Sequence, residues 1–115
     1  MTTVDQARTV SAKEKEFLGR LREVIRSFCP SATILLYGSV ARGAKGAESD
    51  YDIVILTDAS LSREEEDMVE DAIYDLQLVH GVAVSAIFHT KSEWESPLYR
   101  VMPFHQEVDK DAVVL

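Results

Sequence analysis

Apolar residues recur every three or four positions in two long segments of the chain, which is the period of an amphipathic helix. In the first segment they are Phe17, Leu18, Leu21, Val24, Ile25 and Phe28. Ser11, followed three residues later by Glu14, has the form of a capping box, in which each side chain binds the other residue's backbone N–H. This pattern predicts a helix that opens at Ser11 and stops before Pro30.

The second segment has the same three elements of a helix signal. Ser62 and Glu65 form another capping box, acidic residues fill the first turn, and Gly81 suits a C-terminal cap. The residues predicted to form its buried stripe are Met68, Val69, Ala72, Ile73, Leu76 and Val79. We therefore predict a helix from Ser62 to Gly81 with this stripe against the core.

Three short apolar runs, at 32–37, 51–56 and 82–88, are rich in β-branched residues and are predicted to be strands. Beyond them, Ser92 is predicted to cap a short helix and Ser96-Pro97 to start another, which Pro103 ends or kinks. Residues 112–115 are a candidate fourth strand at the edge of the sheet. The order of elements indicates an α/β fold, a small mixed sheet of three core strands flanked by helices.

A chain of 115 residues has the size of one domain. Residues 1–10 are expected to be a loose N-terminal tail and residues 11–115 to form the single folded domain. No apolar run approaches the ~20 residues of a membrane span. The chain has one cysteine, Cys29, which excludes an intrachain disulfide and fits a reducing cytoplasm.

Acidic residues outnumber basic ones by 20 to 12, a formal net charge of −8, which argues against direct binding of nucleic acid. The excess is concentrated between Glu48 and Asp75, a segment that contains eleven acidic residues and one basic residue, Arg63. Two interpretations stay open for this tract. It is either a solvated helix face or a surface that meets a basic partner.

One short segment carries residues that suit phosphate and metal chemistry. Gly38 follows a predicted strand and allows a ligand to approach the backbone, and Ser39 places a hydroxyl beside backbone N–H groups that suit phosphate oxygens. Asp50 and Asp52 lie two apart at the start of the next strand, so both carboxylates point to one face. Paired carboxylates favour a divalent cation, and Mg²⁺ takes one or two of them together with substrate phosphates.

Gly38-Ser39, then ten residues, then Asp50-x-Asp52, resembles the signature of the DNA polymerase beta-like nucleotidyltransferase superfamily. The form Gly-Ser-Val-Ala-Arg-Gly is most similar to the minimal nucleotidyltransferases of toxin–antitoxin pairs with HEPN-type toxins. The resemblance implies a nucleotidyltransferase fold, nucleotide binding at Gly38, Ser39 and Arg42, and catalytic and metal-binding roles for Asp50 and Asp52. It further implies Mg²⁺, with room for a two-metal site, an NTP such as ATP, and a HEPN-type toxin as partner.

Two residues leave alternatives open. Arg42 either touches the triphosphate or pairs with an acid of the 48–52 loop. The family has a third carboxylate on the strand after the long helix, and strand alignment puts Ser85 there. A serine is a poor base at neutral pH. One reading is therefore an enzyme that transfers AMP from ATP to a hydroxyl of a partner protein. The other is a catalytically weakened nucleotide-binding module that neutralises a HEPN-type toxin by direct contact.

Overall fold

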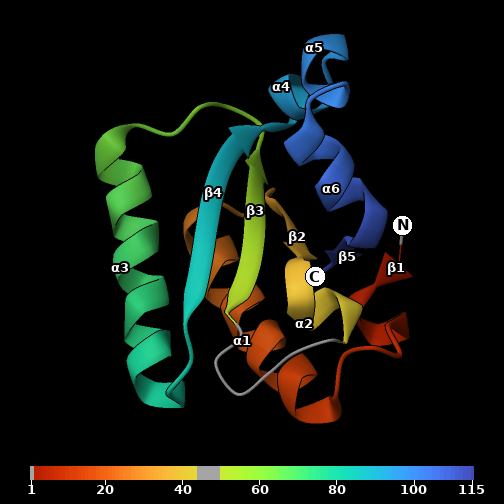
Figure 1. Cartoon of the computed structure of the whole chain (residues 1–115). Coiled ribbons are helices and arrows are strands. Elements are labelled where there is room, and N and C mark those ends of the chain that lie inside the picture. Colours follow the sequence, from red (N-terminus) through yellow and green to blue (C-terminus); the bar gives the residue numbers. More distant parts are fainter. Residues whose placement is uncertain (1, 44–49) are drawn as a thin grey trace.

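The computed structural model of the chain describes residues 2–43 and 50–115. Helices and strands alternate along most of its length (Figure 1). In chain order the elements are β1 (Thr2–Thr3), the short 3-10 helix η1 (Val4–Gln6), α1 (Ala12–Phe28), β2 (Thr33–Tyr37), α2 (Gly38–Arg42), β3 (Tyr51–Thr57), α3 (Arg63–His80), β4 (Val84–Thr90), α4 (Lys91–Glu95), α5 (Pro97–Arg100), α6 (Pro103–Asp111) and β5 (Val113–Val114).

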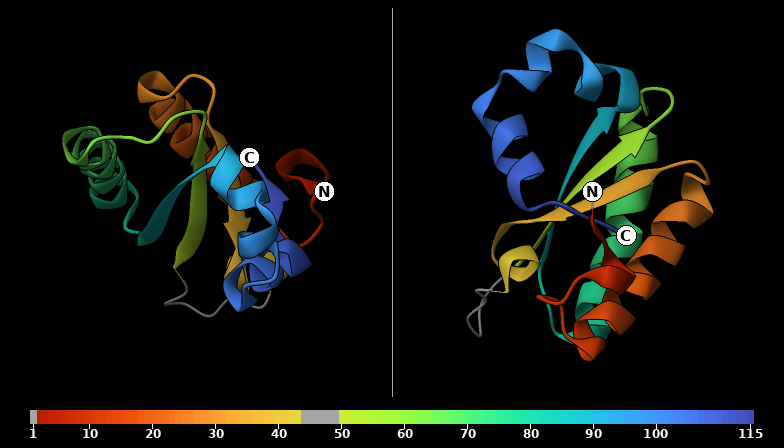
Figure 2. Two further views of the ribbon diagram at one scale, coloured as in Figure 1. Left: turned by 90° about the horizontal axis from the view of Figure 1, so that it is seen from above. Right: turned by 90° about the vertical axis from the view of Figure 1, so that its right-hand side faces the viewer.

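The described strands form one mixed sheet in the order β1-β5-β2-β3-β4. β2 is antiparallel to β3 and β5, whereas β4 is parallel to β3 and β1 is parallel to β5. Helices α1 and α3 cover one face of the sheet, and α4 to α6 lie on the other (Figure 2). This arrangement confirms the predicted α/β fold with a mixed sheet.

Strand residues alternate between two apolar clusters, as the period of two requires. Odd-numbered residues of β3, such as Ile53 and Ile55, pack against α1 and α3. Even-numbered Val54 and Leu56 pack on the other face around the buried Trp94. Asp52 has the same parity as Val54, so its carboxylate lies on the face that carries α4 to α6.

Both predicted capping boxes are present. Ser11 and Glu14 bind each other's backbone N–H at the start of α1, and Ser62 and Glu65 do so at α3. Gly81 ends α3 in the left-handed conformation with φ of +65°. The two long helices are therefore defined at their ends by local hydrogen bonds, and their packing against the sheet orients β3 and β4.

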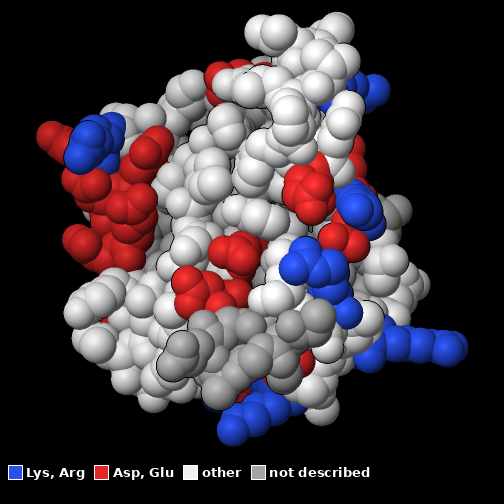
Figure 3. Space-filling model, in the orientation of Figure 1, with Lys and Arg blue, Asp and Glu red and all other residues white. Residues whose placement is uncertain are grey.

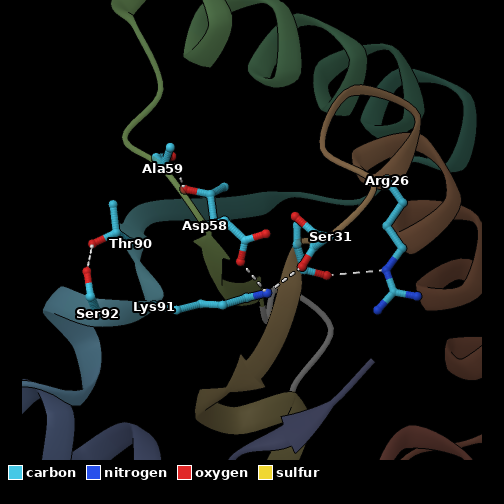
Figure 4. A network of polar contacts seen from close by, with 9 residues as sticks. Arg26, Ser31, Asp58, Ala59, Thr90, Lys91 and Ser92 are labelled. Carbon is cyan, nitrogen blue, oxygen red and sulfur yellow. Dashed lines mark hydrogen bonds and ion pairs between the residues drawn. The ribbon is translucent and has the colours of Figure 1, made fainter.

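A polar network joins three connections at the end of the sheet where β3 and β4 finish (Figure 4). Lys91 donates through Nζ to the Ser31 carbonyl at 2.6 Å and pairs with Oδ1 of Asp58 at 2.9 Å. The pKa of Asp58 is held below its ordinary value, first by a hydrogen bond with the Ser31 side chain and then by Lys91. The network ties the entry to β2 to the exits of β3 and β4.

The prediction of a loose tail at residues 1–10 is wrong for the described part. Val4, Ala7 and Val10 are all buried in the core that α1 covers, and β1 pairs with β5. The Thr9 hydroxyl also donates to the Ala41 carbonyl of α2 at 2.6 Å. Three apolar residues at spacing three are too few to reveal a helix or a strand from sequence, yet they suffice to anchor the segment.

The C-terminal prediction needs three corrections. Pro103 begins α6 instead of ending a helix, because proline is favoured at the first helical position. Thr90, not Ser92, caps α4, since its hydroxyl accepts the N–H of Glu93. The strand at 113–114 lies between β2 and β1 and so is not at the edge of the sheet.

Two members of the stripe predicted for α3 do not face the core. Val69 and Ile73 are buried, but the side chains of Met68 and Val79 are 54% and 77% exposed. Tyr74 and Leu78 are exposed as well, at 56% and 66%. Helix α3 lies toward one border of the sheet, so only a narrow stripe of it contacts the core (Figure 2). Within the described residues, no helix has the length and apolar character to span a membrane.

Shortening a buried side chain of the N-terminal segment is expected to destabilise the fold. Val10→Ala removes about two buried carbon groups from a site with 4% exposure, so the free energy of unfolding should fall by roughly 2 kcal/mol. Val79→Ala makes the same chemical change at an exposed position and should leave stability nearly unchanged. Urea unfolding of both variants measures the difference, and equal effects would mean that residues 2–10 do not belong to the core.

Candidate active site

The turn from β2 into α2 depends on Gly38. Its φ of +79° lies in the left-handed region, which residues with a Cβ rarely adopt. A Cβ placed on Gly38 would lie 2.5 Å from Oδ2 of Asp52. The antiparallel register sets this approach, since Tyr37 lies opposite Asp52. The glycine therefore provides both the backbone turn and the space for the Asp52 carboxylate.

Ser39 and Arg42 both belong to the five-residue helix α2. Ser39 is the second residue of this helix and is half-buried. Arg42 is the last, and its Nη1 lies 3.5 Å from Oδ2 of Asp111 at the end of α6. Asp111 is 69 residues away in the sequence and was not among the two partners expected for Arg42. Both of those expectations stay predictions.

Asp50 and Asp52 form the acidic part of the site. Asp50 is exposed just before β3, and Asp52 is half-buried as its second residue. The pKa of the Asp52 carboxyl lies above its ordinary value, first because burial disfavours the charge and then because Asp50 repels it, while Arg42 acts in the opposite direction. Acidic side chains gather at this end of β3, with basic ones beside them over α2 (Figure 3).

Ser85 lies directly beside Asp52, because the parallel register pairs these two residues. The strand period puts Ser85 and Asp52 on the same face of the sheet. Ser85 is exposed and is flanked along β4 by half-buried residues that face the other side. The strand pairing therefore places beside Asp52 the residue for which the family resemblance implies a third carboxylate, and this role of the position stays a prediction.

Two neighbours of the site were not predicted. Tyr37 lies opposite Asp52, and its pKa is raised, first by burial and then by the negative charge of Asp52. Asp111 pairs with Arg42. The sequence predicts that Tyr37 lies in a strand, but only the register reveals what it faces. No local signal connects Asp111 to residue 42. Six of the ten residues between Ser39 and Asp50, at 44–49, lie outside the described part.

The donor set suits a small hard cation with few protein ligands. In the described part of the chain, no group of three or more His, Cys, Asp or Glu side chains could hold a metal. Asp50 and Asp52 offer two carboxylates whose mutual repulsion a cation relieves. This fits Mg²⁺, which keeps several waters and binds through one or two carboxylates and substrate phosphates. The roles of the five site residues remain predictions.

Adding a methyl group at Gly38 is expected to disturb both the turn and Asp52. Gly38→Ala combines the strain of a positive φ with the Cβ contact to Oδ2 of Asp52. Gly81→Ala is the matched control, because its φ is +65° and nothing lies within 4 Å of its Cβ. The control should cost about 1 kcal/mol and Gly38→Ala more. In an Asp52→Ala background the additional loss of stability caused by Gly38→Ala should largely vanish. A double-mutant cycle from urea unfolding measures this. An additional loss that persists in that background contradicts the contact.

Neutralising Asp52 is expected to stabilise the fold near pH 7 in the absence of divalent cations. A carboxyl with a raised folded-state pKa binds its proton more tightly folded than unfolded, so its charge opposes folding above that pKa. Asp52→Asn removes this opposition. The stability advantage of Asp52→Asn over the wild type should shrink as the pH falls through the raised pKa. It should vanish below the ordinary pKa, where the carboxyl is protonated in the folded and the unfolded state. Thermal melts from pH 7 to pH 3 test this, and an advantage that grows on acidification contradicts it.

The comparisons with known proteins agree with this geometry. A family model described as "Nucleotidyltransferase domain" matches residues 18–114, which include all five site residues. The chain is also 31% identical over 112 residues to a protein of Methanocaldococcus jannaschii named "Putative protein adenylyltransferase", an alignment that covers 92% of this chain and 89% of that protein. With a turn from strand to helix at Gly38 facing two carboxylates on the next strand, the chain belongs to the nucleotidyltransferase domain family.

Proposed function

We propose that the chain transfers a nucleoside monophosphate, AMP from ATP, to a hydroxyl group of a partner protein. The observation that carries the proposal is the close approach of the Asp52 carboxylate to Gly38, at the start of α2. A phosphate-binding turn and a pair of carboxylates thereby meet at one point of the sheet. The name of the Methanocaldococcus relative supports the choice of adenylyl transfer.

The proposed roles follow from the chemistry of each group. The Ser39 hydroxyl and the backbone N–H groups beside it bind the β- and γ-phosphates. Arg42 gives up its ion pair with Asp111 and binds the same phosphates with its positive charge. Asp50 and Asp52 hold Mg²⁺, which when bound neutralises phosphate charge and orients the nucleotide. The acidic surface around the site makes such neutralisation necessary, because nucleotide and carboxylates repel each other.

The reaction is a substitution at the α-phosphorus. The acceptor oxygen forms a bond to this phosphorus, the bond from the α-phosphorus to the bridging oxygen breaks, and pyrophosphate leaves. The proton of the hydroxyl passes to water, since Ser85 beside Asp52 is no base at neutral pH. The transfer should therefore be slow for this family.

A second candidate function rests on the same serine. With Ser85 in place of a carboxylate opposite Asp52, the site has less negative charge and no general base. The chain would then act as a nucleotide-binding module that neutralises a HEPN-type toxin by direct contact. In both cases we propose a protein partner in the cytoplasm and no direct nucleic-acid contact, given one unpaired cysteine and a net charge of −8.

Restoring a carboxylate at position 85 is expected to accelerate the transfer. The measurement is single-turnover transfer of label from α-labelled ATP, with Mg²⁺ and an excess of a HEPN-type partner. Wild type should be slow, and Asp50→Asn with Asp52→Asn should lose both transfer and ATP affinity. Ser85→Asp should raise the rate by roughly tenfold, less than the ~10²–10⁴ of an evolved base. Ser85→Asn, which has the same shape without the charge, should not.

Two results would change the conclusion. A fast wild type with an unaltered rate in Ser85→Asp means that the third carboxylate is dispensable, so the inference of slow transfer is wrong. If no variant transfers label while the complex forms and the partner is inactive, the second candidate function is correct.

A further inference from the structure

The outer edge of β4 has no strand beside it among the described residues. Tyr51 donates its N–H to the Ala83 carbonyl at 2.9 Å, so residues 83, 85 and 87 direct their backbone groups toward β3. Because these directions alternate along a strand, Val84, Ala86 and Phe88 direct theirs to the free edge. The seven pairs with β3 run without a bulge, and β4 contains no lysine or proline. It therefore lacks three of the features with which exposed edges ordinarily prevent pairing.

Helix α3 forms a shelf beside this edge that carries both polar and apolar side chains. A groove of about 210 Å³ between them is lined by Glu70, Ile73, Gln77, Val84 and Ala86. Tyr74 and Leu78 follow Glu70 at spacing four and so share its flank of the helix. Their side chains are 56% and 66% exposed. Seen from above, α3 extends past β4 (Figure 2), so a segment beside β4 would lie against this shelf.

The charge of α3 indicates the chemistry of such a segment. The helix has seven acidic residues and one basic residue, Arg63, which pairs with Asp67. Acidic side chains gather over the N-terminal half of α3 in the view of Figure 3. A second copy of this chain would bring two such helices together and repel itself, whereas a segment with lysine or arginine is attracted. The favoured occupant is a basic segment of another protein.

The edge is also close to the candidate active site. Ser85 belongs to β4 and lies opposite Asp52, on the face away from α3. A strand added to β4 would be two strand spacings, ~10 Å, from the backbone of Asp52. Alternate side chains of that strand would face the shelf, and the others would lie beside Ser85. A tyrosine at one of the positions beside Ser85 has the length to lean across this small side chain toward the carboxylates.

We propose that the free edge of β4 docks an extended, positively charged segment of the acceptor protein as an additional strand. Its backbone pairs with Val84, Ala86 and Phe88, and its basic and apolar side chains lie on the α3 shelf. Its hydroxyl-bearing side chain lies beside Ser85, in position for attack on the α-phosphorus. Only this last part rests on the proposed function, because the docking itself requires no chemistry.

The test uses the whole chain and a synthetic eight-residue peptide. Lysine and valine alternate on one face of the peptide, and the other face has one tyrosine among threonines. At saturation, hydrogen exchange of the Val84, Ala86 and Phe88 amides should slow by tenfold or more. A peptide N-methylated at the amides that would face β4 should not bind. Replacing lysine by glutamate should weaken binding about tenfold.

Matched protein variants test the shelf. Glu70→Lys should weaken binding of the lysine peptide about three- to tenfold and favour the glutamate peptide. Asp75→Lys makes the same charge change five residues later, ~140° around the helix, and should have less than a twofold effect. Equal effects of the two variants would contradict the proposal that the peptide lies on the α3 shelf, because the change in net charge alone would then explain them.

Two readouts separate the docking from the reaction. Slowed exchange at the three amides without label transfer from ATP to the tyrosine supports docking and counts against the proposed function. Label transfer without slowed exchange overturns the docking and leaves the proposed function intact. Slowed exchange at high protein concentration without peptide means that a second copy occupies the edge, which overturns the proposal, as does the absence of any slowing with the lysine peptide.

Discussion

The candidate site depends on one close approach, that of the Asp52 carboxylate to the backbone of Gly38. It requires a residue without a Cβ, a positive φ, and a register that sets Tyr37 opposite Asp52. The first two are properties of one residue, but the register is a property of the whole antiparallel pair. A shift of one position would turn Asp52 to the face of α1 and α3. The core that fixes the register therefore also assembles the site.

The two ends of the sheet differ in how their charged side chains are paired. At the exits of β3 and β4, Lys91, Asp58 and Ser31 are satisfied by one another. At the entry of β3, Asp50 and Asp52 repel each other and burial raises the pKa of Asp52. An ion pair satisfies both of its partners, whereas a pair of like charges that Arg42 only partly offsets costs stability and suits a ligand. Parallel pairing then places Ser85 beside the same acids.

Features set by neighbouring residues were predictable from the sequence. Both capping boxes, the three core strands and the Gly-Ser turn depend on contacts within a few positions, and their chemistry is visible in the sequence. The Arg42–Asp111 pair, the order of β5 and β1, and the exposure of Met68 and Val79 depend on which elements meet. Apolar periodicity indicates a helix face, but it does not reveal how much of that face the sheet covers.

The pairing of β1 with β5 brings the two described ends of the chain together, since Thr2 lies across from Val113. Both strands are on the opposite side of the sheet from β4. Four strand spacings, roughly 19 Å, separate β1 from β4. A fluorophore attached at either end would therefore not obstruct β4, yet it would be within energy-transfer range of a dye on a bound protein. The fold thus provides its own reference point for measuring distances to whatever occupies that edge.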